Sequence, residues 1–235
     1  MSARFVKASN ALRPNDASET RVKLYSYYRS SAAYRVRIAL NLKGLKYDYI
    51  AKHLLKDGGE HRRADYLDIN PQGFVPALEN EGVLITQSLA IIEYLDEVFP
   101  TPGLLPVVPA DRAIVRAMSL LIACDIHPLN NLRVLNYLKS PMEQGSDATA
   151  AWYRHWIAAG FAALDTLIAR YSDAGRHTFK DSVTMADVLL VPQVANSRRY
   201  QMDLSLYPAL QKVATHLEIL PAFVAARPEA QPDAE

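Results

Sequence analysis

The sequence predicts an α/β half followed by an all-helical half. Strand-like and helix-like stretches alternate over residues 21–103, whereas helical periodicity alone fills residues 109–226. The first half has the order β-α-β and then β-β-α, and a β-α-β crossover implies at least one parallel strand pair. We therefore expect two domains with these bounds. The boundary between them is marked by Pro100, Pro102, Pro106 and Pro109.

The composition is that of an ordinary globular protein. Of 235 residues, 50% are hydrophobic and 22% are charged, and the formal net charge is +1 at pH 7. This even balance gives no basic surface for nucleic acid or anionic membranes, so we expect neither as a partner. No apolar run approaches the about 20 residues that cross a bilayer, and residues 1–20 lack the apolar core of a signal peptide. We expect a cytoplasmic protein with a mobile extension over residues 1–20 and a disordered tail over residues 227–235.

A strand-to-helix elbow near the start of the first domain is the most informative stretch. Val22, Leu24 and Ser26 alternate as in a short strand, and residues 36–43 have helical spacing with Gly44 placed to end the helix. Ser30 and Ser31 lie between them, so one of the two is expected at the helix N-cap. Free N–H groups, the positive end of the helix dipole and hydroxyl donors would meet there. That combination favours a bound anion, and a thiolate is one such anion.

The rest of the first domain is predicted from turn and strand signals. Residues 47–50 form a second strand, and residues 74–78 open a third with its proline at the start. Residues 79–82 make a hairpin turn into a strand at 83–85. Ser88 is expected as the N-cap of a helix whose Leu89, Ile92 and Leu95 share one face.

Helical signals fill the second domain. Thr184 and Asp187 form a capping-box pattern, Pro208 suits the first turn of a helix, and Pro221 is expected to end it. Earlier helices are predicted over residues 112–125, 129–138 and 148–170.

Cys124 is the only cysteine of the chain. No disulfide can form within the chain, and no metal site is expected. Cys124 lies in an apolar helical run, so we expect it to be buried as a small hydrophobic residue. We therefore expect that any sulfur chemistry of this protein does not use its own cysteine.

Three motifs in the first domain resemble the cytosolic glutathione transferases. Val75-Pro76 resembles the site where a cis proline exposes a strand edge, and Gln87-Ser88 resembles the anchor of the γ-glutamyl group. Arg29-Ser30-Ser31 followed by Tyr34-Arg35-Val36-Arg37-Ile38-Ala39-Leu40 is similar to the signature of the zeta class, which includes maleylacetoacetate and maleylpyruvate isomerases. The resemblance covers Val22 to about Pro232, with further matching blocks at 87–95, 125–131 and 191–196.

This resemblance implies a fold, a cofactor and a set of roles. The first domain would be thioredoxin-like and bind glutathione, and the second would complete the substrate site of a homodimeric enzyme. The implied catalytic residues are Ser30, Ser31 and Arg29. Glutathione would be bound by Ser30, Ser31, His61, Val75, Pro76, Gln87, Ser88, His127 and Asn131, and a carboxylate-bearing substrate by Arg29, Arg133 and Arg199.

Simpler roles remain open for several of these side chains. An arginine can form an ordinary surface ion pair, and an asparagine beside a helix break can merely close a turn. His127 could cap a helix end, and His61 could be an exposed loop residue. Between the two serines, Ser30 is by resemblance the nearer to a bound sulfur.

The sequence departs from the class at Ala32. Zeta enzymes commonly carry a cysteine directly after the double serine, whereas this chain has alanine. The change argues against a dehalogenase-like role with a protein thiol and weakens an isomerase role less, since glutathione would supply the sulfur.

Three functions follow as hypotheses. The leading one is a glutathione-dependent cis–trans isomerase that converts a maleyl-type oxo-diacid, maleylacetoacetate or maleylpyruvate, to its fumaryl isomer in aromatic catabolism. The second is a general glutathione transferase or peroxidase. The third is a non-catalytic interaction module with a thioredoxin-like fold, consistent with Ala32. The intact serines and Gln87-Ser88 argue against that third hypothesis.

Overall fold

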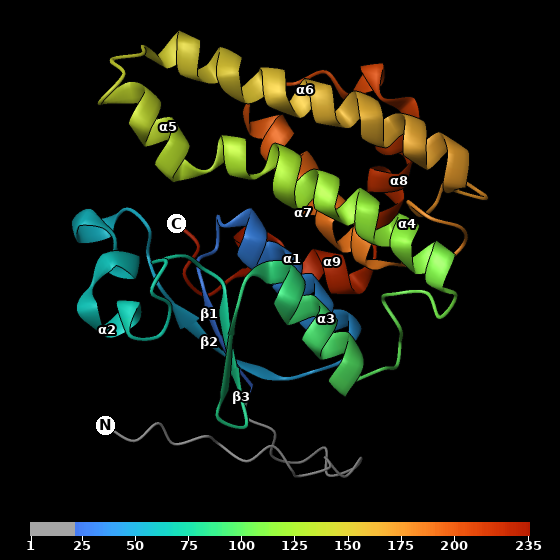
Figure 1. Ribbon diagram of the computed structural model, residues 1–235, viewed down its shortest axis with the longest axis horizontal. Coiled ribbons are helices and arrows are strands. Elements are labelled where there is room, and N and C mark those ends of the chain that lie inside the picture. The colour runs from blue at the N-terminus through green and yellow to red at the C-terminus, as the bar shows by residue number, and fades with distance from the viewer. Residues whose placement is uncertain (1–21) are drawn as a thin grey trace.

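The computed structural model describes residues 22–235 and shows the two expected halves (Figure 1). A sheet half and a helical half lie one above the other, with helices α1 and α3 between the sheet and the helices α4, α5 and α6. The extension expected over residues 1–20 lies outside the described residues.

The sheet has four strands in the order β2-β1-β3-β4. The β1–β2 pair is parallel, as the crossover predicted, and the other two pairs are antiparallel. Glu81 and Gly82 form the predicted hairpin turn, both with positive φ. The elements of this half are β1 Val22–Ser26, α1 Ser31–Leu42, β2 Tyr47–Ala51, α2 Ala64–Leu67, β3 Ala77–Asn80, β4 Val83–Thr86 and α3 Ser88–Val98.

The helical half follows the predicted pattern with two differences. The helix expected over residues 112–125 changes into a π-helix at Leu121, and Pro221 begins a helix instead of ending one. The capping box of Thr184 and Asp187 is present as predicted. The elements are α4 Pro109–Leu120, the π-helix Leu121–Ile126, α5 Leu132–Lys139, α6 Ser146–Tyr171, α7 Met185–Arg199, α8 Pro208–Leu217 and α9 Pro221–Ala225.

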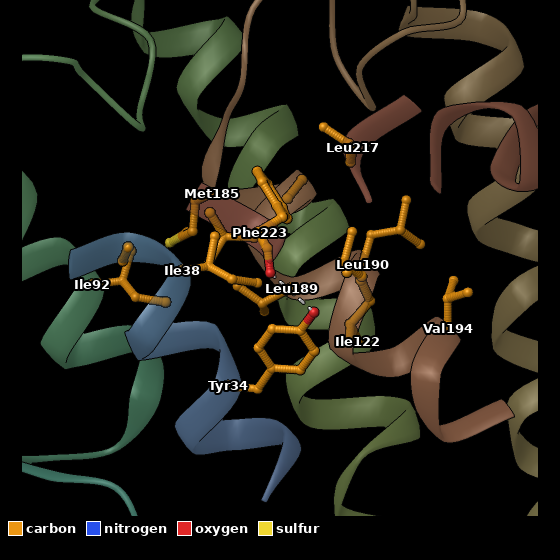
Figure 2. Close-up of a cluster of buried hydrophobic side chains, with 14 of the residues drawn as sticks. Tyr34, Ile38, Ile92, Ile122, Met185, Leu189, Leu190, Val194, Leu217 and Phe223 are labelled. Atoms are coloured by element: carbon orange, nitrogen blue, oxygen red, sulfur yellow. Dashed lines mark hydrogen bonds between the residues drawn. The ribbon is translucent and has the colours of Figure 1, made fainter. Parts of the chain in front are cut away.

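One hydrophobic core joins the two halves. Tyr34 and Ile38 of α1 point toward Leu189 of α7 and Phe223 of α9 (Figure 2). Ile38, Leu189 and Phe223 are fully buried, and the Tyr34 hydroxyl donates to the Phe223 carbonyl at 3.5 Å. Helix α1 therefore packs against α7 and α9, which fixes the elbow at its N-terminus relative to the helical half.

The stretch Pro109–Lys139 contains an 18-residue window that is long and apolar enough to cross a membrane by length and composition. The expectation that no apolar run approaches this length is therefore wrong. The stretch is not one regular helix, because a π-helix and Pro128 interrupt it. Its parts pack against α6 and α7.

The C-terminal segment packs against the first domain, contrary to the disordered tail expected from Arg227. A short 3-10 helix spans Pro228–Ala230. The Asp233 carboxylate then accepts from the Tyr28 backbone N–H at 3.1 Å and from the Tyr49 hydroxyl at 2.6 Å, and Glu235 pairs with Lys56. The end of the chain thus lies beside the segment that follows β2 (Figure 1). The Pro- and Ala-rich composition of the segment suggested disorder, whereas the contacts of Asp233 and Glu235 hold it in place.

Candidate active site

A cavity of about 1230 Å³ lies between the two halves. Its wall combines the β1–α1 elbow, the β4–α3 junction, the π-helix and the last turn of α7. The structure brings together every residue that the sequence nominated, namely Arg29, Ser30, Ser31, His61, Val75, Pro76, Gln87, Ser88, His127, Asn131, Arg133 and Arg199. Their individual roles remain predictions.

Ser30 is the N-cap of α1, as predicted. Its backbone is extended (φ −70°, ψ 115°), and its Oγ accepts from the Ala33 backbone N–H at 3.2 Å. A serine hydroxyl has one hydrogen to donate besides its acceptor lone pairs. The cap uses only the acceptor, and no other residue of the described part of the chain bonds to this hydroxyl, so the Ser30 O–H can donate into the cavity.

Ser31 makes a contact that joins the two halves. Its Oγ lies 3.2 Å from Nδ1 of His127, which follows the π-helix. Burial of the ring, together with the nearby charge of Arg35, lowers the pKa of His127 to about 3. The imidazole is therefore neutral at neutral pH, with one nitrogen as donor and the other as acceptor.

The β4–α3 junction differs from the prediction in one detail. Gln87, not Ser88, is the N-cap of α3, and it adopts a positive φ of 70°. The Gln87 side chain donates to Gln72 Oε1 at 2.7 Å and so does not cap the helix. Ser88 is the first helical residue, and its Oγ accepts from Arg35 Nη1 at 3.3 Å. The junction still presents a helix N-terminus and a hydroxyl to the cavity, which favours an anion.

The Val75–Pro76 peptide bond is cis, as the resemblance implied. Val75 lies just before β3 and is buried. Among residues 22–235, no residue is hydrogen-bonded to its backbone N–H or C=O. Buried backbone groups are nearly always paired, so Val75 fits a peptide ligand that adds to the strand edge.

Three exposed arginines meet at the same cavity from different elements. Arg199 of α7 donates to the Arg29 carbonyl at 3.2 Å, and the Arg133 guanidinium lies 5.0 Å from the ring centre of Phe74. Within residues 22–235 none of the three forms a salt bridge with a carboxylate. The cavity therefore has positive charge available for an acidic ligand.

The simpler role proposed for His61 is absent from the structure, whereas that of Asn131 is present. His61 is buried, not an exposed loop residue, and its burial lowers its pKa. Within the described part of the chain its Nδ1 has no hydrogen-bond partner. Asn131 is the N-cap of α5, where its side chain accepts from the Arg133 N–H at 3.1 Å. The turn-closing role of Asn131 is thus present, and the residue also lines the cavity.

Sequence reasoning missed Arg35 and misplaced Cys124. Cys124 is exposed and lines the cavity, so the expectation of a buried cysteine is wrong. A π-helix adds a residue to each turn and rotates the side chains that follow, which a regular helical pattern does not foresee. Arg35 is a buried arginine that also lines the cavity. A charged residue among the apolar residues of a predicted helix could have indicated this buried position.

Known proteins match the chain in both halves. A family model described as "Glutathione S-transferase, N-terminal domain" matches residues 24–103. A probable maleylacetoacetate isomerase from Vibrio cholerae is 48% identical over 90% of this chain and 97% of its own length.

Solved structures give the same relationship. A holo maleyl pyruvate isomerase, described as a bacterial glutathione S-transferase of the zeta class, superposes with a TM-score of 0.87 at 46% identity, covering 91% of this chain and all of that one. A maleylacetoacetate isomerase from Methylobacterium extorquens AM1, with bound malonate and glutathione, gives 0.84 at 36% identity, covering 91% and 99%. This chain therefore belongs to the zeta class of the glutathione transferases.

Proposed function

We propose that the chain catalyses the glutathione-dependent cis–trans isomerisation of a maleyl-type oxo-diacid to its fumaryl isomer. The observation that carries the proposal is one cavity that joins the Ser30–Ser31 elbow to three arginines without a salt bridge among residues 22–235. The first feature suits a thiolate, and the second suits a substrate with carboxylates. Relatives named for maleylacetoacetate and for maleylpyruvate are similarly close, so both compounds are candidate substrates.

The cavity wall fits glutathione in three places. The Val75 backbone, which has no hydrogen-bond partner within residues 22–235, suits the cysteinyl backbone, and the N-terminus of α3 at Gln87 and Ser88 suits the γ-glutamyl carboxylate. The elbow of Ser30 and Ser31 lines the same cavity, so we expect it to meet the sulfur of the bound tripeptide. Bound glutathione supplies a thiolate that can add reversibly to a conjugated double bond, which permits rotation about that bond.

Ser30 is the better donor to a sulfur. Its cap leaves the O–H free, whereas the Ser31 O–H is free only if His127 carries its proton on Nδ1. A hydroxyl donor and the helix N-terminus both stabilise the thiolate, which lowers the thiol pKa from its usual value of about 8.5. Ser31 then serves chiefly to join the elbow to the helical half.

The arginines would bind and orient the diacid. Guanidinium forks bind carboxylates through two parallel hydrogen bonds, and they stabilise negative charge that develops on the oxo group. Class membership further leads us to propose a cytoplasmic homodimer that acts in aromatic catabolism.

The test is an isomerase assay with maleylpyruvate and with maleylacetoacetate, with and without glutathione. We expect turnover only with glutathione, and we expect Ser30→Ala to lower kcat/KM by about 100-fold. Arg29→Ala should raise the KM of the diacid while the glutathione Kd from calorimetry stays nearly constant. Conjugation of a generic electrophile without isomerisation would instead indicate a general transferase. Failure to bind glutathione would exclude both enzymes and leave an interaction module.

A further inference from the structure

Arg35 is a buried charge with almost no hydrogen-bond partner among residues 22–235. Its side chain is 1% exposed, and its only hydrogen bond among the described residues joins Nη1 to Ser88 Oγ. Neither Nε nor Nη2 has a partner there. Burial lowers the pKa of Arg35 to about 10, so the group still carries its charge at neutral pH. An unpaired buried charge is costly, and such a residue usually serves a ligand or a partner charge.

Arg37, two positions along the same helix, shows what a structural arginine looks like in this protein. It is fully buried too, but its Nε donates to the Ala226 carbonyl at 3.0 Å and its Nη2 to the Tyr28 carbonyl at 3.0 Å. Its Nη1 donates to Ser26 Oγ at 3.2 Å. The fold thus satisfies Arg37 on the side of α1 away from the cavity.

The single bond of Arg35 fixes the orientation of the Ser88 hydroxyl. A guanidinium has donors only, so Ser88 Oγ must be the acceptor in this contact. The Ser88 O–H is then left to donate, and no residue in the described part of the chain accepts from it. It lies at the N-terminus of α3, which itself favours negative charge. Arg35, Ser88 and the helix end thus bring a positive charge, a hydroxyl donor and the positive end of a helix dipole to one place.

We propose that Arg35 is a positioning residue for the α-carboxylate of the γ-glutamyl group of glutathione. It holds the Ser88 hydroxyl as a donor toward that carboxylate, and its positive charge is neutralised when the carboxylate binds. This inference rests on the proposed function and adds a residue, beyond Gln87 and Ser88, that selects the γ-glutamyl end.

The test compares two ligands on the folded protein. Calorimetry measures the Kd of glutathione and of 4-aminobutyryl-cysteinylglycine, which lacks only the α-carboxylate. We expect Arg35→Met to raise the glutathione Kd about tenfold or more and to leave the Kd of the analogue nearly unchanged. Arg35→Lys, which keeps the charge, should recover part of the preference. Because methionine removes a desolvated charge, the urea midpoint of Arg35→Met should equal or exceed that of the wild type.

Arg37→Met is the matched control, because it removes a buried arginine from the same helix. It should lower the urea midpoint and leave the ratio of the two Kd values unchanged. If Arg35→Met kept the wild-type ratio, or lost stability as Arg37→Met does, Arg35 would be a structural residue and the inference would be wrong. If the wild type bound neither ligand, the proposed function itself would fail.

Discussion

Buried polar groups on the two sides of helix α1 differ in whether they have hydrogen-bond partners within the described part of the chain. On the side of the C-terminal segment, Arg37, Tyr28 and Asp233 are satisfied by other residues of the chain. On the side of the cavity, Arg35 and Asn130 have side-chain nitrogens without partners among the described residues, although both are buried. The satisfied side ties distant parts of the chain together, and the unsatisfied side is suited to a ligand. The predictions below test this contrast through stability on each side of the helix.

The largest stability effect is expected from Arg37→Met. It would leave the carbonyls of Ala226 and Tyr28 without their donor, and the C-terminal segment would lose an anchor. We expect the free energy of unfolding to fall by about 3 kcal/mol, measured by urea denaturation. A fall as small as that of a surface substitution would mean that the network on this side is not structural.

The pH dependence of stability tests the cavity side. The pKa of His127 is about 3 in the folded protein and about 6.5 in the unfolded chain. Below pH 6.5, His127 therefore binds a proton in the unfolded chain but stays neutral in the folded protein until the pH approaches 3. The stabilisation is complete above pH 6.5 and is lost as the pH falls toward 3, amounting to about 2 kcal/mol between pH 6.5 and pH 5.

Urea denaturation at several pH values, with His127→Gln as the comparison, measures this loss. The variant should lack that part of the slope. Equal slopes for the two proteins would show that His127 is not held neutral by its surroundings.

A smaller effect is expected from the C-terminal segment. Asp233→Ala removes the acceptor of the Tyr28 N–H and the Tyr49 hydroxyl, so we expect a loss of about 1 kcal/mol in the free energy of unfolding. Glu235→Gln serves as the control, since its ion pair with Lys56 is exposed and should change nothing measurable. If both variants behaved alike, the segment would not be anchored through Asp233.

Much of the fold and site could be predicted because the signals are local. The N-cap at Ser30, the hairpin at Glu81-Gly82 and the capping box at Thr184 depend on neighbouring residues, and the structure contains all three. Such signals have a limit at α3, where Ser88 was the predicted N-cap and Gln87 is the observed one. Gln87 has a positive φ, which glutamine rarely adopts, so its residue type gave no indication of this role.

The sequence by itself determined the order of elements, the elbow with its two serines and the class of chemistry. Periodicity and capping residues act within a few positions of the chain, so their pattern can be recognised without coordinates. Only the tertiary structure decided that Cys124 faces the cavity, that the C-terminal segment is anchored, and that Arg35 lacks the partners that Arg37 has. The bond from Arg37 to Ala226 spans 189 positions, and no local pattern specifies which of two buried arginines will meet its acceptors. That choice depends on how the halves pack around α1.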